Sequence, residues 1–194
     1  MNEHSFMKKE RVNRKALIVA TALRLFATEG YDSTPISRIA KEAGIAQGLL
    51  YNYFRSKGEL LQAIIKEGFD QIREEMQPYL NATDPAKALK EHIGLSLQLV
   101  ERHRDFWKLV HSLRMQHATL RDAMQQVQEV NAFVLQTLTT HFRKLGYKKP
   151  ELEAWLLFAT VDGLVGLYLL AGDEFPLHRL GKHLVDRYAN KNLK

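Results

Sequence analysis

The sequence contains no cysteine among its 194 residues, and this absence excludes several kinds of site. Without cysteine there is no disulfide framework, no thiolate nucleophile and no zinc-thiolate cluster. A reducing compartment is therefore allowed. Because residues 1–14 are polar and lack the apolar core of a secretory leader, we expect the protein to act in the cytoplasm.

Signatures of catalysis are missing as well. The sequence has no His-Glu-x-x-His motif, no phosphate-binding P-loop and no Gly-x-Ser-x-Gly motif. The eight histidines are scattered without the helical spacing of metal ligands, which favours a surface or core position for each of them. We therefore predict that the protein is not an enzyme and has neither a metal site nor a cofactor.

The pattern of apolar residues indicates helices only. No stretch of useful length alternates polar and apolar residues as a strand does, and no internal repeat or low-complexity linker occurs. Hydrophobic residues make up 45% of the chain, which excludes wholesale disorder. We predict an all-α protein with about nine helices, at residues 12–28, 35–43, 47–54, 57–76, 85–100, 105–117, 119–145, 150–171 and 176–190.

Residues 34–59 carry the most informative local pattern. Thr34 is a good N-cap with Pro35 at the first helical position, and Gly44 supplies the left-handed residue that ends a short helix. In the helix that follows, Leu50 and Phe54 fall on one side. The opposite side carries small or hydrogen-bonding groups, namely Gly48, Leu49 and Asn52. This layout is typical of a helix-turn-helix, whose second helix enters the major groove, although a generic corner between two helices shares it.

Positive charge is concentrated around this pattern. Residues 1–66 hold 11 Lys and Arg against 6 Asp and Glu, whereas residues 67–194 hold 17 against 16. A basic excess beside a helix-turn-helix is what binding to phosphates requires. We therefore predict double-stranded DNA as a partner and interpret Lys8–Arg11 with Arg14 and Lys15 as an arm on the DNA backbone, although such a tail can also be merely solvated.

A family resemblance strengthens this interpretation. The residues that carry it are Ala22, Leu25-Phe26, Gly30-Tyr31, Thr34, Ile39-Ala40, Ala43-Gly44-Ile45, Gly48, Leu50-Tyr51, Tyr53-Phe54, Ser56-Lys57 and Glu59-Leu60. Their order resembles the DNA-binding signature of TetR-family transcriptional regulators over residues 12–65, about a third of the chain. The rest resembles that family only in being helical.

The resemblance implies a division of the chain and a set of contacts. Residues 1–55 would form a three-helix DNA-binding domain, and residues 56–194 a larger helical domain for ligand binding and dimerisation. By position, Gln47, Gly48, Leu49 and Asn52 would approach bases, while Thr34, Ser37, Tyr51, Tyr53 and Lys57 would hold phosphates. The sequence departs from the family pattern at Ala46, which replaces a polar cap, and at Leu49, which suggests contact with a thymine methyl group.

The helix after the helix-turn-helix is expected to act as a lever. Ser56 and Glu59 form a capping box at its start, and a loop of about two residues separates it from the preceding helix. Movement of the helix 57–76 would then shift the DNA-binding domain almost rigidly.

The segment Glu151–Ala171 is apolar enough to approach the length of a bilayer span. Its acidic residues, and the lack of a basic flank that distinctly marks the inside end, favour a soluble helix that is buried on nearly all sides, without a membrane. The family pairs through its last two helices, so the resemblance implies a homodimer. Its expected interface is Ala159, Gly163, Gly166, Leu170, Leu177 and Leu184, although these helices can also bury within one chain.

TetR-like regulators keep a cavity for a small molecule in the larger domain. The residues that would line it here are Trp107, His111, Arg114, Met115, Phe133, Trp155 and Phe158, for which ordinary core packing is the alternative. We predict a ligand-responsive transcriptional regulator, more specifically a repressor released from a palindromic operator by a mainly apolar effector. The alternatives are a sequence-nonspecific DNA-binding protein and a helical protein that binds lipid or another small molecule.

Overall fold

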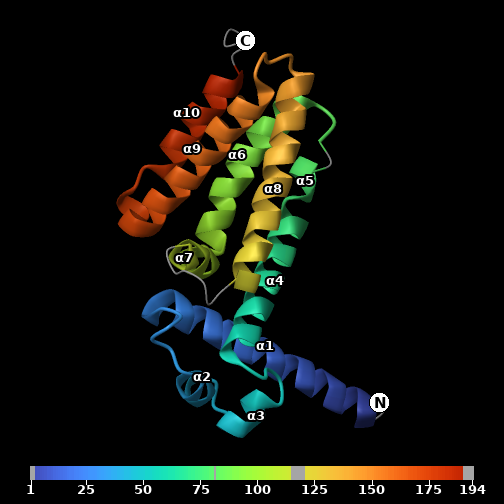
Figure 1. Cartoon of the computed structure of the whole chain (residues 1–194), viewed down its shortest axis with the longest axis vertical. Helices are drawn as coiled ribbons and strands as arrows, with labels where there is room; N and C mark the ends of the chain where they lie inside the picture. Colours follow the sequence, from blue (N-terminus) through green and yellow to red (C-terminus); the bar gives the residue numbers. More distant parts are fainter. Residues whose placement is uncertain (1–2, 81, 115–120, 190–194) are drawn as a thin grey trace. The chain divides into compact units, whose positions relative to one another are not determined.

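The computed structural model describes residues 3–80, 82–114 and 121–189, and these ranges are helical with no strand (Figure 1). This confirms the predicted all-α class. The helices are α1 (Glu3–Glu29), α2 (Ile36–Glu42), α3 (Gln47–Tyr51), α4 (Lys57–Glu75), α5 (Gln77–Leu80), α6 (Pro85–Arg102), α7 (Arg104–Leu113), α8 (Arg121–Lys144), α9 (Pro150–Ala171), the short 3₁₀ turn η1 (Gly172–Glu174) and α10 (Leu177–Ala189).

The chain forms two compact units. Unit 1 comprises residues 1–68 and 108–126, and unit 2 comprises residues 69–107 and 127–194. The chain passes from one unit to the other within the sequences of α4, α7 and α8. The predicted functional boundary between residues 55 and 56 stays a prediction.

Unit 1 is built around α1, which packs on α2, and α2 packs in turn on α3. The inward side chains are almost all aliphatic or aromatic, so burial of apolar surface holds the short helices α2 and α3 in place. They are Ile18, Ala22, Leu25 and Phe26 of α1, Ile39 and Ala40 of α2, Leu50 of α3, Phe54, and Leu60, Leu61 and Ile64 of α4.

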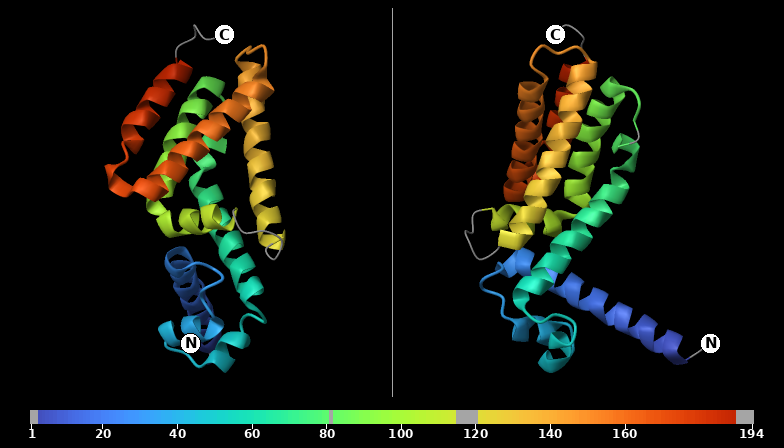
Figure 2. Two further views of the ribbon diagram at one scale, coloured as in Figure 1. Left: turned by 60° about the vertical axis from the view of Figure 1, so that its left-hand side comes forward. Right: turned by 45° about the vertical axis from the view of Figure 1, so that its right-hand side comes forward.

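Unit 2 contains a bundle in which α6, α9 and α10 lie against one another (Figure 2). Its core is one apolar cluster that includes Leu89, Ile93, Leu97, Leu138, Phe142, Leu157, Val161, Leu177 and Leu184. Asp84 starts α6 as predicted, because its carboxylate accepts a hydrogen bond from the amide of Ala86 at 2.9 Å. Pro85 follows at the first helical position, where a backbone N–H would have no partner within the helix, so its lack of an N–H costs nothing.

Several helix ends differ from the predicted ones. The first helix was predicted to begin at residue 12, yet α1 begins at Glu3, since residues 3–11 contain neither glycine nor proline to break a helix. The four-residue α5 was not predicted, and it tolerates Pro78 because that residue stands in its first turn. α3 ends at Tyr51 instead of residue 54, so the connection to α4 has five residues, 52–56, rather than two.

The prediction that the helix 151–171 is buried on nearly all sides is wrong. The segment Pro150–Glu174 is long and apolar enough to cross a bilayer by length and composition, but only 28% of its most apolar window is buried. Leu152, Trp155, Leu156, Leu167 and Leu170 are exposed, with Leu170 at 86%. Uniform apolarity around this helix removed the periodicity that would have distinguished its two faces.

Candidate nucleic-acid interface

The turn between α2 and α3 is fixed by its glycine. Gly44 has a φ of +66°, a left-handed conformation that other residues rarely adopt. The amide of Gly44 donates to the Lys41 carbonyl at 3.2 Å, and the amide of Ile45 donates to the Ala40 carbonyl at 3.0 Å. This pair of bonds is a Schellman motif, which ends α2 sharply and directs the chain into α3.

The short helix α3 has two chemically different flanks. Leu50 and, just after the helix, Phe54 are buried in unit 1 and anchor this segment. Gln47, Gly48 and Asn52 are exposed. Tyr51 is also exposed, at 46%, while Leu49 and Tyr53 are half-buried. The helix therefore offers hydrogen-bonding side chains and a glycine on the flank opposite its anchor, as the sequence predicted.

The N-terminus of α3 has no side-chain cap. Ala46 occupies the N-cap position with extended backbone angles and makes no capping hydrogen bond through its side chain. The free N–H groups of the first turn stay available to an external acceptor such as a phosphate oxygen, provided that the helix docks with this end toward DNA.

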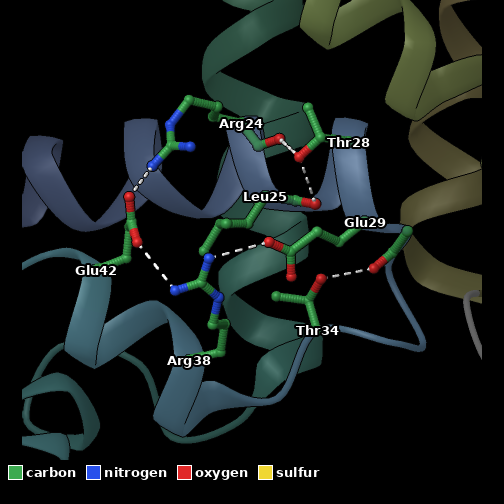
Figure 3. Close-up of polar contacts among 8 residues, drawn as sticks. Arg24, Leu25, Thr28, Glu29, Thr34, Arg38 and Glu42 are labelled. Carbon is green, nitrogen blue, oxygen red and sulfur yellow. Dashed lines mark hydrogen bonds and ion pairs between the residues drawn. The ribbon is translucent and has the colours of Figure 1, made fainter.

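The structure contradicts the role that was predicted for Thr34. Its side chain is fully buried, and its hydroxyl donates to the Gly30 carbonyl at 2.7 Å (Figure 3). Pro35 holds the N-cap position of α2 in its place, without a side-chain cap. Thr34 thus closes the turn between α1 and α2 and cannot reach a phosphate, whereas Ser37 on α2 is exposed.

Lys57 is tied to the same turn. Its ammonium donates to the Asp32 carbonyl at 3.3 Å and lies 4.3 Å from the centre of the Tyr31 ring. Burial lowers the pKa of Lys57, and Asp32 acts in the opposite direction. An ammonium has three donors, so the bond to the Asp32 carbonyl uses only part of the hydrogen-bonding capacity of Lys57.

Surface ion pairs brace α1 against α2. Arg24 of α1 reaches one oxygen of Glu42 at 2.6 Å, and Arg38 of α2 reaches the other at 3.0 Å (Figure 3). Arg38 also pairs with Glu29 at 3.2 Å. These partners lower the pKa of Glu42, with the hydrogen bond from Arg24 as the largest cause. This brace was not predicted, although the spacing of Arg38 and Glu42 by four residues signals a helical ion pair.

The start of α4 has the predicted reciprocal cap. The Ser56 hydroxyl accepts the amide of Glu59 at 3.1 Å, and the Glu59 carboxylate accepts the amide of Arg55 at 2.7 Å. The carboxylate reaches one residue further back than in the usual capping box. The cap fixes the point at which α4 leaves the helix-turn-helix.

The residues predicted for a ligand pocket are not all in the interior. Phe133 and Trp155 are more than half exposed, so they cannot line an internal cavity of their own chain as they stand. In unit 2, Trp107 and Phe158 are half-buried and pack against the apolar cluster. In unit 1, His111 and Arg114 are partly buried, and Met115 lies outside the described residues.

The residues predicted for a dimer interface also divide into two sets. Leu177 and Leu184 are buried in the core of their own chain, which removes them from any contact surface. Ala159, Gly163 and Leu170 are exposed on α9, and Gly166 is half-buried. The two sets could not be separated from the sequence alone, because both consist of apolar residues at helical spacing.

Residues 18–64 match the family model described as bacterial regulatory proteins, tetR family. The chain is 26% identical over 189 residues to the fatty acid metabolism regulator protein of Bacillus subtilis. The aligned region covers 93% of this chain and 95% of that protein. It is also 26% identical over 189 residues to the HTH-type transcriptional regulator BetI of Escherichia coli, with 92% and 95% covered. Among solved structures, the transcriptional regulator FadR from Bacillus subtilis in complex with stearoyl-CoA superposes with a TM-score of 0.76 at 21% identity, covering 91% of this chain and 98% of that one.

Proposed function

Because this chain belongs to the tetR family of bacterial regulatory proteins and is a DNA-binding transcriptional regulator, we propose that it is a dimeric cytoplasmic repressor released from a palindromic operator by a mainly apolar effector. The observation that carries this proposal is the two-sided character of α3. Leu50 anchors the helix, while Gln47, Gly48 and Asn52 face away from the core.

The proposed contacts follow from the chemistry of each side chain. The amides of Gln47 and Asn52 can each donate and accept, which suits the edge of an adenine in the major groove. Leu49 is half-buried and would meet a thymine methyl group at the margin of the contact. Ser37, Tyr51 and Tyr53 would bind phosphates, which fix the register of the helix without reading sequence.

A second copy of the chain is the proposed cover for α9. Leu152, Leu156, Ala159, Gly163 and Leu170 follow one another at helical spacing along the exposed face of this helix. Exposed apolar stripes of this length mark contact surfaces, and a bilayer is disfavoured because Glu151, Glu153 and Asp162 lie in the same helix. Two copies would carry two reading helices, as a palindromic operator requires.

The effector is proposed to bind within the larger helical domain. Trp107 is half-buried against the apolar cluster of unit 2, and its buried indole N–H has no hydrogen-bond partner among the described residues. Such a donor suits a single acceptor on an otherwise apolar molecule. The relative named for fatty acid metabolism and the solved neighbour with stearoyl-CoA favour a long-chain acyl compound as the class of effector.

Release of DNA would proceed through α4. This helix is continuous from Lys57 to Glu75 and begins at the capped Ser56. An effector that binds better to the conformation unable to bind DNA would shift α4 and change the spacing of the two reading helices. A coupling of about 1–3 kcal/mol, typical of regulatory proteins, suffices.

Gel-shift titration of three variants tests the proposed reading of DNA. We expect Gln47→Ala to lose about 1–3 kcal/mol of discrimination at one base pair, and Tyr51→Phe to weaken binding by about 1 kcal/mol on every sequence. Gln98→Ala, which removes an exposed glutamine from α6, is the matched control. If all three variants bound like the wild type, α3 would not be the reading helix.

A further inference from the structure

Three polar rings from three different helices meet inside unit 2. Tyr79 of α5 lies 5.0 Å from His92 of α6 and 5.8 Å from His141 of α8, measured between ring centres. Tyr79 is 1% exposed, His92 4% and His141 8%. We refer to these three residues as the Tyr-His cluster.

Each residue of the Tyr-His cluster has a buried polar atom without a hydrogen-bond partner among the described residues. The atoms are the Tyr79 hydroxyl oxygen and the Nδ1 nitrogens of His92 and His141. Buried polar groups of proteins are nearly always paired, so three unpaired ones in contact need a specific explanation. Apolar residues flank them, since Leu89 and Ile93 on α6 and Leu138 and Phe142 on α8 belong to the core cluster.

The Tyr-His cluster carries no charge near neutral pH. Burial lowers the pKa of His92 to about 4, with a further contribution from His141. Burial also lowers the pKa of His141, helped by Lys144, and it raises the pKa of Tyr79. An anionic group placed here would meet no positive partner in the cluster, and an unpaired buried charge is strongly unfavourable.

An uncharged polar group has the complementary chemistry. The phenol both donates and accepts, and each Nδ1 donates or accepts according to the tautomer of its ring. A hydroxyl or carbonyl would pair with these atoms without bringing a charge into the core, whereas a carboxylate or sulfate would pair with them only by burying an uncompensated charge. The apolar surroundings demand that the rest of the molecule be hydrocarbon.

We propose that the Tyr-His cluster binds the uncharged hydroxyl or carbonyl group of a long-chain effector. This inference rests on the proposed function, because it assigns a chemical class to part of the effector. It predicts that alkyl alcohols and alkyl carbonyl compounds bind more tightly than alkyl anions of the same chain length.

The test uses the full-length protein and two probes, decan-1-ol and decyl sulfate, with affinities measured by calorimetric titration. The wild type should bind decan-1-ol more tightly than decyl sulfate. Tyr79→Phe should weaken the binding of decan-1-ol by about 2- to 10-fold, the usual effect of one hydrogen bond. Tyr147→Phe is the matched control, because it removes the hydroxyl of a second tyrosine of unit 2, which is partly buried and packs on Phe142.

Thermal unfolding without ligand separates binding from a structural role. Tyr79→Phe should keep or raise the midpoint of unfolding, because it removes an unpaired buried hydroxyl, whereas loss of a structural hydrogen bond would lower the midpoint. A lowered midpoint, an unchanged affinity for decan-1-ol in Tyr79→Phe, or a preference of the wild type for decyl sulfate would each overturn the inference.

The same titrations distinguish this inference from the proposed function. If a long-chain acyl-CoA released the wild type from DNA while Tyr79→Phe bound decan-1-ol normally, only the inference would be wrong. If none of decan-1-ol, decyl sulfate and decanoyl-CoA bound the wild type, and none released it from DNA, both the proposed effector class and the inference would be wrong.

Discussion

Replacement of Gly48 by alanine is expected to change protein stability and DNA binding in opposite directions. Gly48 stands in the first turn of α3 with ordinary helical backbone angles, and a Cβ atom added to it meets nothing within 4 Å. Alanine is favoured over glycine in a helix by about 0.5–1 kcal/mol, so Gly48→Ala should raise the free energy of unfolding by up to this amount.

On DNA, the same methyl group occupies space that the proposed contact needs. If α3 lies in the major groove with Gly48 against base edges, the added carbon keeps the helix from closing onto them. Loss of one such contact costs about 1–3 kcal/mol, which corresponds to a Kd about 5- to 150-fold higher at the same salt concentration. General damage to the fold would instead lower stability and affinity together.

The assay combines urea unfolding with fluorescence anisotropy of labelled operator DNA. Gly94→Ala on α6 is the matched control, since a Cβ atom there also meets nothing within 4 Å and Gly94 lies in unit 2. The control should gain stability and keep its Kd. If Gly48→Ala gained stability and bound the operator as tightly as the wild type, α3 would not approach base edges closely.

Two further variants test other parts of the molecule. Gly163→Leu on α9 should leave the fold intact, because a Cβ atom there also meets nothing within 4 Å, but should shift the protein from dimer to monomer in sedimentation velocity; an unchanged dimer would place the interface elsewhere. Acid should destabilise the protein through His92. The pKa of this residue is about 4 in the folded protein and 6.5 in the unfolded chain, so at pH values between these two the unfolded chain binds more protons. The contribution of this group to the free energy of unfolding should be fully present above pH 6.5 and fall by on the order of 3 kcal/mol toward pH 4, as measured by urea unfolding. His92→Phe should flatten this pH dependence. If stability fell equally steeply with pH in the wild type and in His92→Phe, His92 would not be the group responsible.

Helix ends that depend on local chemistry were predictable from the sequence. Gly44 has a positive φ and ends α2 where the sequence predicted a helix end. Ser56 caps α4 through its own hydroxyl, only three residues away from its partner. Each of these signals acts within one turn of the chain, so sequence alone specifies it.

Features that depend on distant neighbours were not predictable in the same way. Thr34 has the chemistry of an N-cap, but the fold brings its hydroxyl to the Gly30 carbonyl and buries it. Trp155 and Phe133 have the composition of pocket residues, but helical spacing does not say which flank of an apolar helix faces inward. The Tyr-His cluster was overlooked for a related reason, because its members lie far apart in sequence and meet only through the packing of three helices.

Selection of bound sequences from a random pool of duplex DNA tests the central claim most directly. If the exposed flank of α3 reads bases in a dimer, the wild type should enrich a palindrome with half-sites about one helical turn apart. Gln47→Ala should enrich the same spacing with one position relaxed in each half-site. Failure of the wild type to enrich any sequence above the starting pool, at a salt concentration where it still binds DNA, would contradict the claim.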